Sequence, residues 1–309
     1  MFRFTKALSA GLAALTLSAF QAAPPELPPR LAALAEDAAA ARSFDYTALK
    51  AEGADLKALS DAVYMRSRID GDSRRCLTEA ETILQTELAA AGEAATAEAY
   101  EADRLAEPPF SHIADRVRAA GDATDPRVRE LLRRAAQDQL QRRGWDLASQ
   151  PWSETPTAGA QSRFNSRLGE QGCQIDGGNT AWLKADVAAN GWYRISTHGE
   201  TASSAAWLMA QHADRDRAFQ REVLALLEPL VATGETSAAN YAYLHDRVAV
   251  GENRPQRYGT QGRCVAKGVW APNDLEDAER VRALRDEAEI GSLAEYTAHM
   301  HRYCADFTG

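Results

Sequence analysis

The stretch AAWLMAQHADRDRAFQ, residues 205–220, decides the fold because it predicts two buried helices joined by a short polar turn. Nearly every residue from 202 to 213 is apolar or small. A helix that is apolar all round belongs in a protein core, since it has no face suited to water. His212 follows Ala205 and Leu208 on one helical stripe, so we expect its imidazole to lie at the edge of the core.

A second helix is predicted directly after the turn. Asp214 or Asp216 can cap its first backbone N–H groups. Its apolar residues recur at helical spacing: Phe219, Val223, Leu226, Leu227 and Leu230. We expect Pro229 to bend or end its last turn.

Upstream of these helices, the sequence predicts a helical N-terminal extension over residues 23–121. Ala- and Glu-rich helical stretches cover residues 31–41, 46–68 and 76–105. Alternating β-branched runs, which are typical of strands, do not occur there. Nothing in this part suggests chemistry, and the expected role is support or contact with a protein partner.

Residues 125–309 are predicted to form the main domain. Asp125 and Pro126 are typical of a helix start, and this helix is expected to stop at Gly144. Residues 145–178 are rich in Ser, Thr, Pro and Gly and are predicted to be a loop, followed by a short helix over 179–190.

The C-terminal part adds further helices and one extended segment. A helix is expected from Ser237 to about Ala249, and a capping box, Ser292 with Glu295, begins the last helix. Only residues 256–270 favour an extended structure, a small hairpin broken at Gly262. The predicted fold class is therefore mainly α: a multi-helix, bundle-like domain with one small β-hairpin.

The N-terminus predicts export. Arg3 and Lys6 precede an apolar run from Ala7 to Phe20, the order found in a secretory signal peptide, which we place at residues 1–22. Cuts after Ala19, Ala22 or Ala23 are all compatible with it. The run is short for a permanent membrane anchor. The predicted location is periplasmic or secreted, and the net charge of −9 argues against nucleic-acid binding.

Four cysteines in an exported chain suggest two disulfides. Three pairings are open, and we favour Cys264 with Cys304 and Cys76 with Cys173, because one bridge then stays within the C-terminal part. The spacing offers neither C-x-x-C nor H-x-x-x-H. The sequence also has no P-loop and no serine- or zinc-hydrolase motif, so no metal or cofactor is expected.

His212 is the leading candidate for a catalytic residue. It could act as a general acid or base, or it could be a buried structural histidine whose charged form is favoured by the dipole at the helix C-terminus. Asp246 is the second catalytic candidate, because it lies beside the apolar face of its helix and an unpaired buried carboxylate is costly.

Five other residues are candidates for substrate binding: Arg247, Gln261, Tyr258, Asp138 and Gln139. Arg247 can hold a carboxylate or phosphate, or neutralise a neighbour. Gln261 and Tyr258 lie on the extended segment, and the glycine between Tyr258 and Thr260 suggests close approach of a ligand or of another backbone. Asp138 projects near the buried side of its helix, where Arg142 can pair with it.

Three motifs together resemble the bacterial domain of unknown function 6624 family. They are QHAD at residues 211–214, DRV at 246–248 and QRYGTQ at 256–261, and a helix like that of residues 131–142 precedes them. The resemblance covers about residues 125–303. It implies a fold, but the family carries no assigned reaction.

Two functional hypotheses follow. The first is an exported, cofactor-independent, hydrolase-like enzyme acting on a small-molecule or envelope-derived ligand, in which Asp246 orients or assists His212 and Arg247 with Gln261 holds the substrate. The second is a non-catalytic periplasmic binding or scaffold domain, in which the same polar residues form a satisfied internal network. We favour the first.

Overall fold

The computed structural model describes residues 26–66, 75–90, 93, 95–99, 123–148, 157–305 and 307. Helices and one two-stranded hairpin make up this part of the chain, as predicted. The predicted signal peptide, residues 1–22, lies wholly outside the described residues. No helix in the described ranges is long and apolar enough to cross a membrane.

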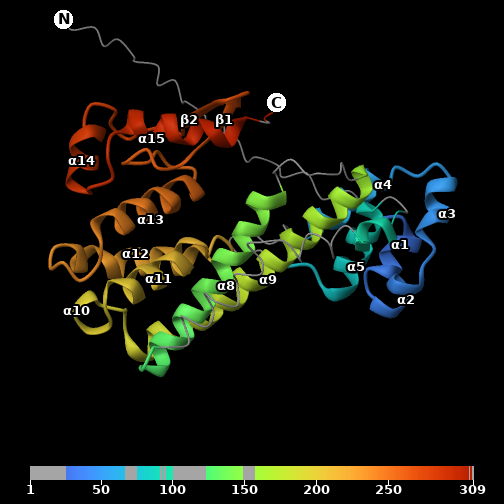
Figure 1. Ribbon diagram of the computed structural model, residues 1–309, viewed down its shortest axis with the longest axis horizontal. Coiled ribbons are helices and arrows are strands. Elements are labelled where there is room, and N and C mark those ends of the chain that lie inside the picture. Colours follow the sequence, from blue (N-terminus) through green and yellow to red (C-terminus); the bar gives the residue numbers. More distant parts are fainter. Residues whose placement is uncertain are drawn as a thin grey trace, which may run out of the picture.

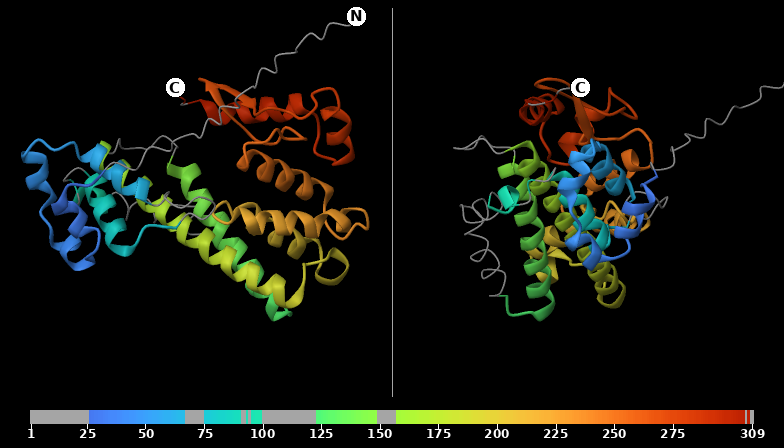
Figure 2. Two further views of the ribbon diagram at one scale, coloured as in Figure 1. Left: turned by 180° about the vertical axis from the view of Figure 1, so that it is seen from behind. Right: turned by 90° about the vertical axis from the view of Figure 1, so that its right-hand side faces the viewer.

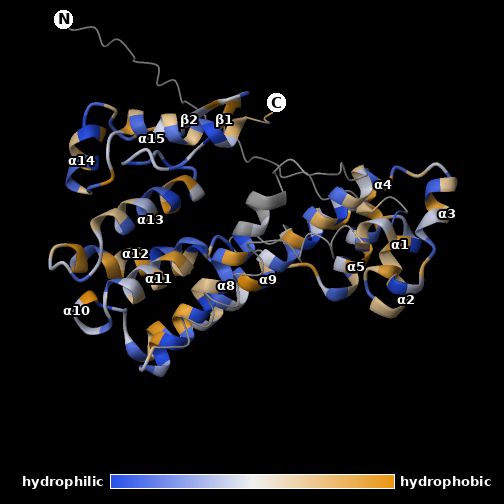
Figure 3. Ribbon diagram, viewed as in Figure 1, coloured by the Kyte–Doolittle hydropathy of each residue, from blue (hydrophilic) through white to orange (hydrophobic). Residues whose placement is uncertain are grey.

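Two long helices form the centre of the molecule, α8 (Pro126–Ala148) and α9 (Ala158–Asn190). The N-terminal helices lie at one end of α9, and the elements that follow α9 lie at its other end (Figures 1 and 2). Polar and apolar residues alternate along the helices (Figure 3), as expected for helices with one buried face.

The N-terminal helices have a hydrophobic core of their own. They are α1 (Pro29–Leu34), α2 (Ala38–Ser43), α3 (Tyr46–Ala51), α4 (Leu56–Met65) and α5 (Glu79–Ala89). Buried leucines from several of them meet in this core, among them Leu31, Leu49, Leu84 and Leu88. The helical stretches predicted for residues 31–41 and 46–68 are helical where the structure describes them, but each is divided into two helices. Asp37, Asp45 and Asp55 each accept a backbone N–H bond from the residues that follow, and each therefore starts a new helix.

The predicted loop over residues 145–178 is also wrong, because most of it belongs to α9. Phe164 and Leu168 are buried one turn apart on this helix, which packs against α5. This packing overrides the poor helix propensity of the Ser- and Gly-rich sequence. Helix α8 likewise continues through Gly144, since an internal glycine costs a helix only about 1 kcal/mol.

The second core joins α8 and the C-terminal half of α9 to the helices that follow. These are α10 (Ile195–His198), α11 (Glu200–Gln211), α12 (Arg217–Val231) and α13 (Ala238–Gly251). Leu131, Leu183, Met209, Val223 and Leu244 are buried at their junction. The predicted pair of helices around residues 205–220 is confirmed, and Asp216, not Asp214, caps α12 by accepting the Phe219 N–H.

The C-terminal part contains the hairpin of β1 (Gly262–Ala266) and β2 (Val269–Pro272), then α14 (Val281–Glu287), α15 (Leu293–Met300) and the short 3-10 helix η3 (His301–Cys304). Residues 256–261 form a loop rather than a strand, so the predicted break at Gly262 is where β1 starts. A side chain at Gly262 would collide with the Trp270 ring and the Ala271 carbonyl oxygen, both 2.3 Å from the ideal Cβ position.

Both favoured disulfide pairings are confirmed. Cys264–Cys304 joins β1 to η3, and Cys76–Cys173 joins the segment before α5 to the middle of α9. The second bridge spans 97 residues of sequence and fastens the N-terminal helices to the central helix.

One buried ion cluster holds the start of α5 in place. Glu81 is almost fully buried and accepts hydrogen bonds from Arg66 and Arg75, each at 2.6 Å, and from the Thr78 N–H at 2.9 Å. Burial alone would raise the pKa of Glu81, but these donors outweigh it and lower the pKa to about 2.

This cluster predicts an acid-sensitive N-terminal region. Because the folded pKa of Glu81 is depressed, its contribution to stability is present above its unfolded value of 4.5 and is lost as the pH falls toward about 2. Urea unfolding should show this loss, and Glu81→Gln should remove that part of the pH dependence at a cost of about 2 kcal/mol at neutral pH. An unchanged acid profile in Glu81→Gln would contradict the assignment.

Candidate functional site

His212 ends α11 and forms a hydrogen-bonded pair with Asp138 of α8. The His212 Nδ1 lies 2.8 Å and 3.0 Å from the two carboxylate oxygens of Asp138. The Asp138 side chain is 1% exposed and that of His212 is 14% exposed. Gln139 donates to the other side of Asp138 at 2.8 Å. The carboxylate that orients His212 is therefore Asp138, and Gln139 holds that carboxylate in turn.

Arg142 links this pair to a second carboxylate, Asp176 of α9. The Arg142 guanidinium lies 2.9 Å and 3.0 Å from the Asp176 oxygens and 3.3 Å from Asp138, which confirms the predicted i, i+4 pair. Its Nε also lies 2.9 Å from His212 Nδ1. Since both nitrogens carry a proton when His212 donates to Asp138, we assign the Arg142 Nε–H to the Asp138 oxygen.

The same cluster contains metal-ligand atom types. One atom each from Asp138, Asp176 and His212 lies within 4.8 Å of the other two. An imidazole and two carboxylates are suitable ligands for a transition metal. The Arg142 guanidinium lies among these groups and supplies the positive charge that the two carboxylates need.

The three titratable groups of the cluster have shifted pKa values. Burial raises the pKa of Asp176 to about 7, with the Asp138 charge acting in the same direction against Arg142. Burial would also raise the pKa of Asp138, but its bond to His212 and the nearby charges hold it below the usual value. Burial lowers the pKa of His212. At neutral pH the pair therefore consists of an anionic Asp138 and a neutral His212.

Asp214 and Arg247 form a second polar group beside His212. Arg247 Nε donates to Asp214 at 2.7 Å, and its Nη2 bonds to the other carboxylate oxygen. Arg247 Nη1 lies 3.5 Å from the Gln261 side-chain oxygen. Both members of the ion pair are partly exposed. The structure thus brings Arg247 and Gln261 together, as the substrate-binding hypothesis requires.

Asp246 lies in a different environment, fully buried beneath the loop of residues 256–261. It accepts hydrogen bonds from the backbone N–H groups of Arg257, Tyr258 and Thr260 at 2.8–3.0 Å, and from the Thr260 hydroxyl at 3.0 Å. Within the described part of the chain it makes no hydrogen bond to His212. The expectation that Asp246 orients His212 is wrong, because its carboxylate oxygens are taken up by this loop.

Other buried side chains complete the support of this loop. Gln256 bridges its two ends, donating to the Gln261 carbonyl oxygen at 2.7 Å and accepting the Gln261 N–H at 2.8 Å. Arg285, also fully buried, donates to the Tyr258 carbonyl oxygen at 2.7 Å. Tyr258 itself is buried against the His245 ring. Its side chain packs in the interior, and Gln261 is the loop residue whose side chain reaches the Asp214–Arg247 pair.

Comparison with known protein families places this whole arrangement within one unit. Residues 130–304 match the profile of a family of unknown function, DUF6624. The chain belongs to this family. No curated protein and no solved structure matches the chain. The DUF6624 match includes every residue of the two polar groups and of the loop, whereas α1 to α5 lie outside it.

Within the DUF6624 domain, sequence reasoning missed two contributors to the site. Asp176 was missed because the sequence predicts a loop for residues 145–178, and a residue in a loop cannot be assigned to a helix face. Arg285 escaped because a charged residue on a short amphipathic helix is normally solvated. The spacing of Asp176 four residues before Thr180, which donates to its carbonyl oxygen, is a helical signal that could have placed Asp176.

Proposed function

We propose that this protein is an exported, cofactor-independent, hydrolase-like enzyme in which His212 is the general base and Asp138 orients it. The Asp138–His212 hydrogen bond at 2.8 Å carries the proposal. It fixes the Nδ1–H tautomer and leaves the lone pair of Nε2 available. Within the described residues Nε2 makes no hydrogen bond, and the ring is partly exposed to solvent.

The proposed step is activation of water. His212 Nε2 accepts a proton from a water molecule, the hydroxyl adds to the electrophilic atom of the substrate, and the same proton then passes to the leaving group. Asp138 stabilises the imidazolium that forms between these transfers. Arg247 and Gln261 hold an anionic or polar group of the substrate.

Asp246 has a positioning role in this proposal rather than a catalytic one. Its bonds to the backbone of residues 257–260 hold the loop that carries Gln261 beside Arg247. Arg285 supports the same loop from the carbonyl side.

Export is supported by two observations. Arg3, Lys6 and the apolar run that follows have the pattern of a signal peptide, and all four cysteines are paired. We therefore place the protein in the periplasm or outside the cell.

Turnover of a chromogenic panel of peptide, ester and glycoside substrates tests the proposal. His212→Gln should lower turnover by roughly 100-fold or more, and it should also lower the melting temperature, because the buried Asp138 loses its hydrogen bond to His212. His299→Gln, which replaces a histidine on α15 far along the chain, is the matched control and should retain full turnover. Equal turnover in wild type and His212→Gln would refute the assignment.

The alternative is a non-catalytic binding or scaffold domain, and the satisfied network around Asp246 favours it. In that case His212→Gln would destabilise the protein to the same extent, because the buried Asp138 loses its donor under either function, and wild type would turn over none of the substrates. Turnover, measured at a temperature where both wild type and the variant are fully folded, therefore separates the two functions.

A further inference from the structure

The hairpin of β1 and β2 exposes apolar side chains near its turn. Figure 1 shows the hairpin at the outer edge of the molecule, close to the C-terminus. Val265 is 49% exposed and Val269 is 42% exposed, one on each side of the turn. Tyr303 of η3 is 58% exposed. These are three of the five large hydrophobic residues that are exposed in the described part of the chain, so the exposure is concentrated in one place.

The inner face of the hairpin is packed on η3, which leaves the outer face free. The Gly268 N–H donates to the Cys304 carbonyl oxygen at 2.7 Å, and the Cys264–Cys304 disulfide joins β1 to η3. Trp270 is buried on the inner face, and its backbone N–H donates to an η3 imidazole at 3.0 Å. Successive strand residues point to opposite faces, so Val269, next to Trp270, lies on the outer face.

The charges around the turn are all positive. The hairpin and residues 296–305 contain Arg263, Lys267 and Arg302, all exposed, and no Asp or Glu. The next acidic residue, Asp306, lies outside the described residues. The whole chain has 44 acidic against 35 basic residues. A cationic region on an acidic protein suits an anionic partner, which the rest of the surface repels. The hairpin patch consists of Arg263, Val265, Lys267, Val269, Arg302 and Tyr303.

A lipid surface fits the hairpin patch better than a protein does. Three apolar side chains are few for a stable protein interface, which takes about 800 Å² from each partner. At a bilayer surface, apolar side chains enter the boundary between headgroups and acyl chains, while Lys and Arg contact anionic headgroups. Tyrosine is enriched at the same depth. The Arg302 guanidinium lies 4.7 Å from the centre of the Tyr303 ring, so this cation and this ring reach the surface together.

We propose that the hairpin patch docks the protein onto an anionic phospholipid surface. The two valines and the tyrosine enter the interface, and the three basic side chains contact lipid phosphates. The Cys264–Cys304 bridge keeps the hairpin and η3 together as one rigid docking element. The inference goes beyond the proposed function and does not depend on it, because docking involves neither His212 nor Asp138.

Co-sedimentation of the full-length mature protein with vesicles tests the proposal. Vesicles of equal parts phosphatidylglycerol and phosphatidylcholine should bind wild type. Pure phosphatidylcholine vesicles should bind it roughly tenfold more weakly or less, since each Lys or Arg near an anionic surface contributes about fivefold to binding. High salt should remove most of the binding to the anionic vesicles, because it screens exposed charges.

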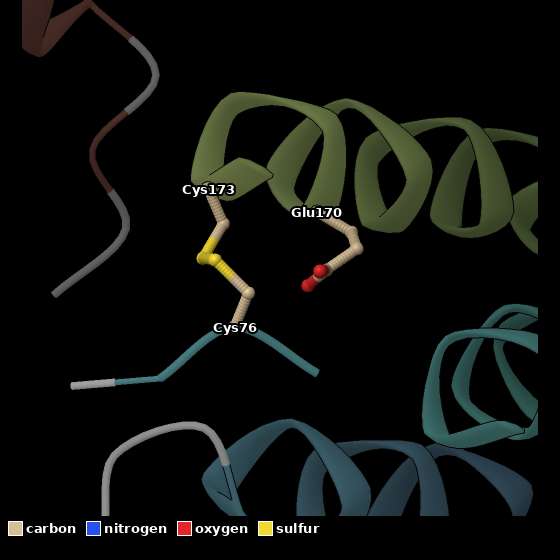
Figure 4. Close-up of side chains that lie close together, drawn as sticks. All are labelled: Cys76, Glu170 and Cys173. Carbon is tan, nitrogen blue, oxygen red and sulfur yellow. A yellow bond between two sulfur atoms is a disulfide. The ribbon is translucent and has the colours of Figure 1, made fainter. Parts of the chain in front are cut away.

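The charge arm of the test uses Lys267→Glu. This variant changes the patch by two charge units and should weaken binding to the anionic vesicles by about 25-fold. Lys50→Glu is the matched control, because it changes the net charge equally at an exposed position of α3. It lies among the N-terminal helices, the part of the molecule that the other disulfide, Cys76–Cys173, fastens to α9 (Figure 4). It should bind nearly like wild type.

The apolar arm uses Val265→Ser, which should weaken binding several-fold without changing the melting temperature, because the side chain is exposed. Leu226→Ser is its control: it removes an exposed hydrophobic side chain of α12, outside the patch, and should bind like wild type.

Absence of binding by wild type, or equal weakening by Lys267→Glu and Lys50→Glu, overturns the docking site. Equal binding by Val265→Ser and wild type overturns the insertion of the hairpin into the interface. A dimer of wild type that dissociates in Val265→Ser would assign the patch to a second copy of the chain instead. His212→Gln should bind vesicles like wild type, so failure of the general base and failure of the docking site are separate results.

Discussion

Replacing Asp246 with alanine is expected to destabilise the protein by about 3–5 kcal/mol, because four hydrogen-bond donors lose their acceptor in a fully buried place. The loss includes a charge effect. Arg285 approaches the same loop from its carbonyl side, so removing the anion leaves a buried guanidinium without the nearby negative charge.

Urea unfolding at neutral pH measures this cost. Asp286→Ala is the matched control, since Asp286 is exposed on α14 and should change stability by no more than about 0.5 kcal/mol. Hydrogen exchange locates the effect: the amides of Tyr258 and Thr260 should lose protection in Asp246→Ala. A cost below that of the control would mean that the loop does not depend on this carboxylate.

The Asp246 variant also distinguishes positioning from catalysis. Asp246→Asn keeps the shape of the side chain but places an amide donor against backbone N–H groups, so it should destabilise the loop as well. If Asp246 acted on the reacting atoms, turnover would fall even where the folded population is complete. We expect the larger effect on KM, because Gln261 loses its fixed place beside Arg247.

The sequence predicted the helical class and the presence of two bridges, since these depend on local periodicity and on the number of cysteines. The pairing was favoured because it keeps one bridge within the C-terminal part. The secondary structure predicted from the sequence is wrong where tertiary packing overrides helix propensity. The first half of α9 has a Ser- and Gly-rich sequence, and it is helical because Phe164 and Leu168 are buried against α5. A single sequence does not show which distant helix will cover such residues.

For the candidate site, the sequence indicated polar residues that lie close together in the structure, but it did not predict which of them contact one another. His212, Asp138 and Arg247 were identified because polar residues among apolar ones are costly unless they are paired. The choice of partners depends on tertiary structure: Asp138 is 74 residues from His212 in sequence, and Asp246 meets its own loop 11–14 residues later. The sequence alone does not distinguish the partly exposed Arg247, the paired Asp138 and the loop-bound Asp246.

Asp138→Asn is expected to cost about 2–4 kcal/mol, because His212 and Arg142 both lose their buried anionic partner. The substitution should also change the titration of Asp176. The Asp138 charge contributes to raising the pKa of Asp176 to about 7, so that pKa should fall in Asp138→Asn, where Arg142 remains as the nearest charge.

The sign of the pH effect follows from this shift. Because the folded pKa of Asp176 is raised, its contribution to stability is complete below the unfolded value of 3.8 and is lost as the pH rises through about 7. His212 acts oppositely: its folded pKa is lowered, so its contribution is present above 6.5 and is lost as the pH falls through the folded value. The two together should give wild type a shallow stability profile between these limits.

Carbon-13 NMR of the Asp176 carboxyl group, from about pH 4 to about pH 8, measures the pKa of Asp176 directly. In Asp138→Asn the midpoint should move to lower pH, and the stability loss assigned to Asp176 should be complete at lower pH as well. The exposed control Asp286→Asn should leave the Asp176 midpoint in place. An unmoved Asp176 midpoint in Asp138→Asn would show that the two carboxylates do not interact. The cluster would then consist of two separate pairs, Asp138 with His212 and Arg142 with Asp176.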